Sequence, residues 1–213
     1  MAITNALFEA LLMIVSLTGA MKLFTLRDRP GLDFACAALL IVVAATLLGA
    51  IRYGGVSAPM LVAAHETVSL MATILAPSWV IACIVVLLRG EPGKAALAVL
   101  WLLPAIVVPL GVAEATAEIG SIYAQMAGLV MMVLMLAAGV MLAVRGSAAA
   151  GAAFVLGSAG YAGAALSIMG FFGLSASAAM DLYHASLSVW AAGLAFGALA
   201  VDAIKRRDTS HSQ

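Results

Sequence analysis

Long runs of apolar residues, interrupted by short polar breaks, follow one another along the whole chain. A helix that crosses a bilayer needs about 20 mostly apolar residues, and these runs lack the alternation of apolar and polar residues that barrel strands show. The pattern therefore predicts an all-α integral membrane protein, folded as one bundle of seven transmembrane helices. The predicted spans cover residues 3–23, 32–51, 60–88, 95–112, 119–144, 147–173 and 176–204, and a short polar tail follows over residues 205–213.

Most breaks between the predicted spans contain residues that favour turns, such as Pro30 with Gly31 and Gly54 with Gly55. Gly and Pro interrupt regular helices because of their special backbone conformations. The break between the last two spans, over residues 172–175, carries no charge. A very short hairpin or a re-entrant pair is therefore the alternative there to two complete crossings.

The basic residues are distributed unevenly between the two ends of the predicted spans. Of the ten Lys and Arg residues, all except Arg52 fall in the first, third and fifth loops or in the C-terminal tail. Because cytoplasmic loops are enriched in Lys and Arg, we expect the N-terminus outside and the C-terminus in the cytoplasm. The Ala- and Val-rich spans and the lack of a targeting segment favour the cytoplasmic (inner) membrane of a bacterial cell.

Composition narrows the classes of function. Hydrophobic residues make up 65% of the chain and charged residues 9%, with a mean hydropathy of +1.18. A soluble domain of this size could not hide so much apolar surface from water, so a soluble enzyme and a disordered chain are excluded. The formal net charge is +0, which provides no basic field for nucleic acid. Membrane lipid is the expected partner.

Ionisable residues inside predicted spans are the main candidates for function, because they are costly in a bilayer. They are Glu9, His65, Glu66, Asp181 and His184. With the orientation above, the first, third and seventh spans run in the same direction, and these side chains all fall in the outer half of the bundle. The sequence therefore predicts one polar site near the outer leaflet.

A divalent metal ion is the first interpretation of this site. Zinc accepts His nitrogen and carboxylate oxygen, and catalytic zinc keeps three protein ligands and a water molecule. His65, Asp181 and His184 could supply the ligands, with Glu9 or Glu66 as the base. Zinc lowers the pKa of its bound water to about 7, so the predicted chemistry is hydrolysis of a lipid-like substrate.

Three other functions stay open for the same residues. Haem b could be held between His65 and His184 in a membrane electron carrier. A relay of Glu, His and Asp side chains could move protons in a small proton-coupled transporter. Alternatively, Glu9 and Asp181 could only hydrogen-bond the two histidines and stabilise a bundle without chemistry.

A short sequence motif occurs in both the third and the seventh span. Both contain His-x-x-x-Ser, with His65 before Ser69 and His184 before Ser188. Residues four apart lie on one face of a helix. This repeated motif would fit two parallel three-helix repeats joined by the fourth span, an arrangement known among membrane proteins.

Small residues recur at helical spacing in the sixth span, at Gly157, Gly160 and Gly163. Such residues let two helix backbones approach closely in lipid. The stripe predicts close packing against a neighbouring helix of the same chain or the seam of a homo-oligomer.

Overall fold

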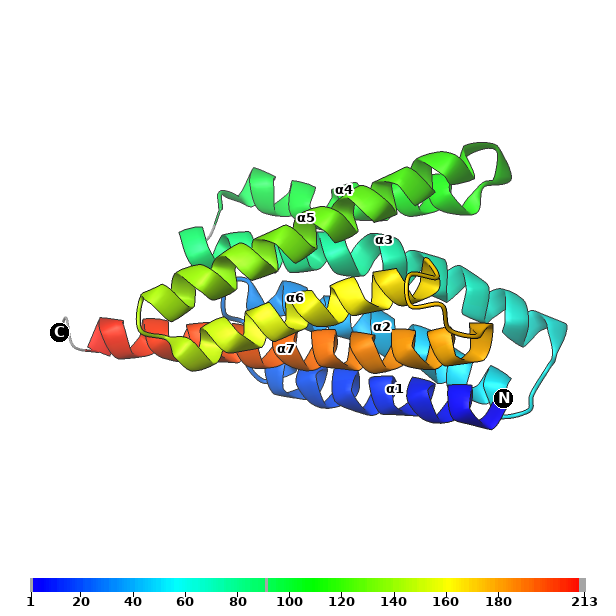
Figure 1. Ribbon diagram of the computed structural model, residues 1–213. Coiled ribbons are helices and arrows are strands. Elements are labelled where there is room, and N and C mark those ends of the chain that lie inside the picture. Colours follow the sequence, from blue (N-terminus) through cyan, green and yellow to red (C-terminus); the bar gives the residue numbers. More distant parts are fainter. Residues whose placement is uncertain (1, 91, 211–213) are drawn as a thin grey trace.

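The computed structural model describes residues 2–90 and 92–210, and its regular structure is entirely helical over these residues (Figure 1). Seven of the helices are long and apolar enough to cross a bilayer. The prediction of an all-helical, seven-helix bundle is thereby confirmed, and the fold fits a multi-pass membrane protein. The helices are α1 (Ala2–Phe24), α2 (Leu32–Tyr53), α3 (Pro59–Arg89), α4 (Lys94–Val112), α5 (Ala117–Val144), α6 (Ala148–Ile168) and α7 (Ala176–Ser210), with a short 3₁₀ helix, η1 (Glu114–Thr116), before α5.

The last two helices differ from their predicted limits. Helix α6 ends at Ile168, and the chain then turns through Gly170 and Gly173, whose φ angles of 76° and 62° favour glycine. Both α6 and α7 still have the length of a membrane span. At the other end, α7 continues as a helix to Ser210, where the sequence predicted a polar tail. Residues 211–213 of that tail lie outside the described residues.

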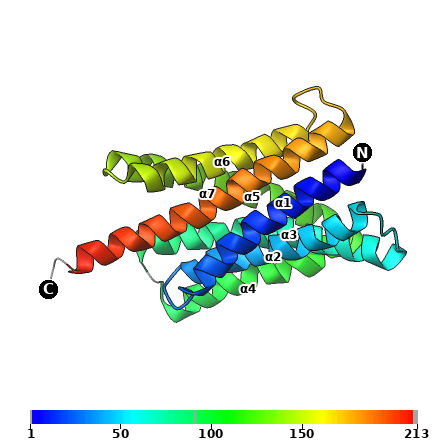
Figure 2. The same ribbon diagram turned by 90° about the horizontal axis from the view of Figure 1, so that it is seen from below.

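Six of the seven spanning helices form a closed ring, and helix α4 lies outside it (Figures 1 and 2). Around the ring, α1 contacts α2, α2 contacts α3, α3 contacts α5, α5 contacts α6, α6 contacts α7, and α7 returns to α1. Helix α4 packs on the outside against α3 and α5, and only a small part of its surface is buried. Its exposed apolar face suits contact with lipid.

The connections alternate between the two ends of the bundle. The N-terminus and the connections α2–α3, α4–α5 and α6–α7 lie at one end, here called the N-terminal end (Figure 1). The C-terminus and the connections α1–α2 and α5–α6 lie at the other, the C-terminal end. Which end faces the cytoplasm stays a prediction from the basic residues.

The C-terminal half of the ring is filled by side chains. Phe34, Leu39, Ile84 and Leu194 are almost completely buried there, and such close packing excludes water. An ion pair between Arg29 and Asp202 links the α1–α2 connection to α7 at this end. The N-terminal half contains a cavity instead, where the candidate site lies.

The small residues of α6 face α7 of the same chain. A Cβ atom added at Gly160 would lie 2.6 Å from the Ser186 carbonyl oxygen and 2.7 Å from the Trp190 amide nitrogen. A Cβ atom at Gly157 would lie 3.4 Å from the Gly193 Cα, and one at Gly163 would lie 3.1 Å from the Ser186 hydroxyl. This stripe therefore serves close packing within the chain. A homo-oligomer through this stripe stays a prediction.

Candidate functional site

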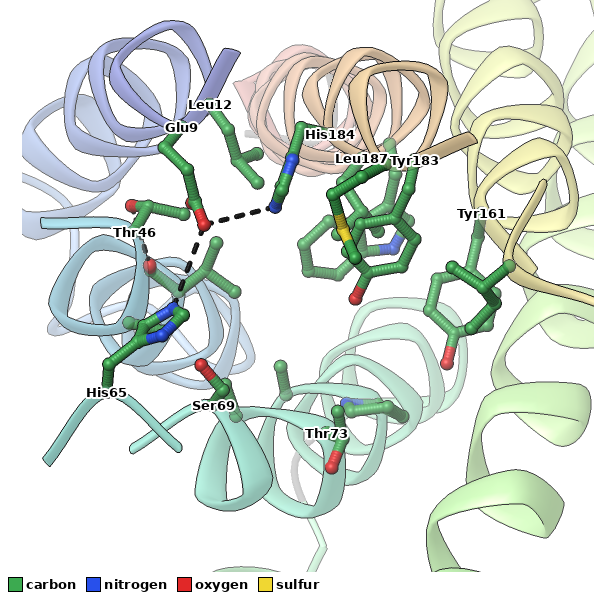
Figure 3. Close-up of a pocket in the computed structure, with 18 of the residues that line it drawn as sticks. Glu9, Leu12, Thr46, His65, Ser69, Thr73, Tyr161, Tyr183, His184 and Leu187 are labelled. Atoms are coloured by element: carbon green, nitrogen blue, oxygen red, sulfur yellow. Dashed lines mark hydrogen bonds and ion pairs between the residues drawn. The ribbon is translucent and has the colours of Figure 1, made fainter. Parts of the chain in front are cut away.

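A cavity of about 350 Å³ lies between α1, α2, α3, α6 and α7 in the N-terminal half of the ring (Figure 3). Its polar lining is concentrated on α1 and on the facing parts of α3 and α7, whereas the rest is mostly apolar or aromatic. A few placed polar groups within a mostly apolar wall are typical of ligand pockets. The polar residues that line it include Glu9, Thr46, His65, Ser69, Thr73 and His184.

Glu9 is the centre of the polar wall. Its side chain projects from α1 towards His65 of α3 and His184 of α7 (Figure 3). One carboxylate oxygen, Oε1, lies 3.1 Å from His184 Nε2 and 3.7 Å from His65 Nε2. Glu9 is only 3% exposed, and both histidines are buried. Three helices distant in sequence thus bring three ionisable groups to one point.

Gly49 on α2 makes room for this cluster. A Cβ atom at Gly49 would collide with the Glu9 carboxylate and lie 2.9 Å from His65 Nε2. Any larger residue would therefore displace the carboxylate or the imidazole. The absence of a side chain at position 49 is part of the site.

Arg52 determines which nitrogen of His65 carries the proton. Its Nη1 lies 3.1 Å from His65 Nδ1 and 3.4 Å from a Glu66 carboxylate oxygen. A guanidinium group can only donate hydrogen bonds, so His65 Nδ1 accepts and the imidazole is neutral. The single ring proton then lies on Nε2, the nitrogen that faces Glu9.

His184 presents the same nitrogen to Glu9. Its Nε2 lies 3.1 Å from the carboxyl oxygen, while its buried Nδ1 has no hydrogen-bond partner among the described residues. The Tyr183 ring stands edge-on to His184, with 5.1 Å between ring centroids. Among the described residues, Glu9 faces the Nε2 atoms of two imidazoles and contacts no Lys or Arg.

Not all of the residues predicted for the site take part in this cluster. Glu9, His65 and His184 come together as expected. Glu66 pairs with Arg52, and its side chain is 65% exposed, outside the cavity wall. Asp181 also does not line the cavity, and its buried Oδ1 has no hydrogen-bond partner.

The two His-x-x-x-Ser segments differ in their contacts. Ser188 donates a hydrogen bond of 2.9 Å to the carbonyl oxygen of His184 within α7. Ser69 instead lines the cavity on α3 (Figure 3). The segments therefore do different work, and a three-helix repeat stays a prediction.

The geometry gives little support to a metal or haem site. Within residues 2–90 and 92–210, no group of three His, Cys, Asp or Glu side chains is placed to hold a metal ion. His65 turns an N–H group towards the cluster, whereas a zinc ligand needs a free lone pair. The Glu9 carboxylate also occupies the place between the two Nε2 atoms that a haem iron would need. Zinc and haem b stay predictions from the sequence.

Sequence analysis missed some residues of the site. The importance of Gly49 depends on which helix faces it, and glycine in a span is otherwise common. Tyr183 stands out only through its place in the cavity wall. Arg52 did carry a signal, because it is the one basic residue on the side predicted to be outside.

Comparisons with protein-family models, with curated proteins and with solved structures give no match.

Proposed function

We propose that the protein is a proton-linked membrane carrier for a small solute, which binds in the cavity beside Glu9. The observation that carries this proposal is the buried Glu9 carboxyl group, which faces the Nε2 atoms of His65 and His184 at the wall of a ligand-sized cavity. Carboxylate and imidazole groups within a membrane typically form proton relays in pumps and transporters. Of the functions that the sequence left open, the relay agrees best with this arrangement.

The charges around Glu9 favour exchange of a proton. From α3, His65 faces Glu9 directly, and its neighbour Glu66 pairs with Arg52 of α2. From α7, His184 faces Glu9. The hydrogen bond from Arg52 makes His65 neutral, and half-buried Arg52 and exposed Glu66 neutralise each other.

Two further titratable groups of α7 lie near Glu9. Tyr183 lines the same cavity, and Asp181 lies three residues before His184 but not in the wall. Neither supplies a positive charge. With a neutral His184, an ionised Glu9 is a buried negative charge without a compensating cation among the described residues, which is expensive in a low-dielectric environment. Either protonation of Glu9 or binding of a ligand in the cavity removes the cost of this buried charge. Binding of a ligand is therefore linked to protonation.

The cavity also suits one state of a carrier. It occupies the N-terminal half of the ring, while Phe34, Ile84 and other core residues fill the C-terminal half. Transport would require the second half to open as the first closes. Pro77 lines the cavity inside α3, and an internal proline is a place where a helix can bend because one hydrogen bond is missing.

Proteoliposomes that contain the full chain and a trapped pH dye test this function. Three solutes of similar shape and different charge are added outside in turn: benzyltrimethylammonium, benzyldimethylamine N-oxide and phenylmethanesulfonate. We expect at least one of them to change the internal pH with the wild-type protein and not with Glu9→Gln. Glu66→Gln, which removes a carboxylate outside the cavity, is the matched control and should behave as wild type. The proposal is wrong if none of the solutes produces a pH change that depends on Glu9.

A further inference from the structure

The cavity wall combines one negative charge with several aromatic rings. Among the described residues that line it, Glu9 is the only carboxylate, and there is no Lys or Arg. Four aromatic residues line the same space: Tyr53, Tyr161, Tyr183 and Trp190. The charge of Glu9 and the aromatic rings together determine the kind of solute that fits.

The aromatic residues line the same cavity as Glu9, and two of them lie close together. Tyr183 of α7 and Tyr161 of α6 line the same cavity as Ser69 and Thr73 of α3 (Figure 3). The rings of Tyr161 and Trp190 are 6.3 Å apart, tilted at 54° to each other, and Trp190 is only 2% exposed. Their faces carry negative electrostatic potential, which attracts a cation within about 6 Å of a ring centroid.

We propose that the solute is a small organic monocation with an apolar body, such as a quaternary or protonated amine. This inference rests on the proposed function, since it names the ligand class of the same cavity. The positive group would lie between Glu9 and the aromatic rings, and the apolar part would contact Leu12, Val42 and Leu187, which also line the wall. The hydroxyl groups of Ser69 and Thr73 suit a modest polar substituent.

Because Glu9 provides a single negative charge, it pairs with either the cation or a proton and not with both. At low pH the carboxyl group holds a proton in the empty cavity, and the site is neutral. When the cation binds, the carboxyl O–H bond breaks, the proton passes to water at the cavity, and the carboxylate pairs with the cation. The Nε2–H groups of His65 and His184 face Glu9 Oε1 in both states and keep their own protons. One positive charge leaves for each one that enters.

Among the described residues, no cation outside the cavity wall neutralises the negative charge of Glu9. Arg52 is the nearest cation to His65, but it also pairs with Glu66 and does not line the cavity. A bound anion would meet the Glu9 carboxylate without a compensating guanidinium or ammonium group, and like-charge contacts of this kind disfavour binding. With a neutral solute in the cavity, only a proton would neutralise Glu9.

Isothermal titration of the purified full chain in detergent tests the ligand class. Benzyltrimethylammonium is compared with benzyldimethylamine N-oxide, which has nearly the same shape but no net charge, and with phenylmethanesulfonate. We expect the cation to bind at least about tenfold more tightly than either of the others, the ratio that one buried charge contact typically contributes. Glu9→Gln should reduce cation affinity by about tenfold or more, whereas Glu66→Gln should stay within about twofold.

A second variant pair guards against misfolding of Glu9→Gln. Tyr183→Phe keeps the aromatic ring and should retain cation affinity, while Tyr183→Leu removes the ring and should lower it several-fold. Tighter binding of the N-oxide or the sulfonate, or no binding of the cation, would overturn the cation inference. If the cation binds by way of Glu9 and yet moves no protons in proteoliposomes, the inference stands and the carrier function fails.

Discussion

Gly49→Ala is the substitution that tests the geometry around Glu9 most sharply, because two effects oppose each other there. Alanine in a helix interior is about 1 kcal/mol more favourable than glycine. The added Cβ atom, however, would lie 2.9 Å from His65 Nε2, so the imidazole must move by about half an ångström to reach the ordinary contact distance of 3.4 Å. It would also collide with the Glu9 carboxylate. Overpacking of this kind costs about 1–3 kcal/mol.

The two effects separate when Glu9 is removed. In the wild-type background we expect Gly49→Ala to lower the free energy of unfolding by up to about 2 kcal/mol. In a Glu9→Ala background the main collision is absent, and the same change should raise it by about 1 kcal/mol. Equilibrium unfolding of the four proteins in detergent measures the coupling between the two positions, expected at about 1–3 kcal/mol. Effects that add within about 0.5 kcal/mol would refute the contact between Gly49 and Glu9.

Three further predictions concern the histidines, metals and topology. Replacing Arg52 by Gln removes the guanidinium donor to His65, so ¹⁵N chemical shifts of the His65 ring should show a mixed tautomer instead of the Nε2–H form; an unchanged spectrum would contradict the tautomer argument. Treatment with a strong chelator should leave cation binding unchanged, and the purified protein should show no Soret band, whereas stoichiometric zinc or haem would restore the metal or electron-carrier interpretation. Single cysteines at Thr116 and Pro92 test the orientation: a membrane-impermeant reagent added outside should label the first and not the second, and the reverse pattern would invert the topology.

The fold follows from the sequence because bilayer thickness fixes the length of a span. Seven apolar runs of sufficient length predict seven helices, and the structure has them. The end of α7 was missed because hydropathy detects only the part of a helix that matches the membrane. At the end of the span, Asp202 and Arg206 form an i,i+4 ion pair at 3.1 Å, a type of contact that stabilises a helix.

The site could be predicted only in part, because residue type does not determine direction. Glu9, His65 and His184 were found because ionisable groups are rare within spans. Glu66 is next to His65 and so points about 100° away around the helix, which explains its pairing with Arg52 outside the cavity. Asp181 lies three residues from His184, near the same face, and only the packing of α7 excludes it from the wall. The tautomer of His65 likewise depends on a contact between helices.

The number of protons released per cation bound is the most direct test of the account. Titration of the wild-type protein with benzyltrimethylammonium in weakly buffered solution, across a series of pH values, gives this number. We expect it to approach one as the pH falls and Glu9 becomes protonated in the empty cavity, with binding weakening over the same range. Glu9→Gln should release none, and Glu66→Gln should match wild type. Equal release from the wild type and from Glu9→Gln would contradict the exchange of proton and cation at Glu9.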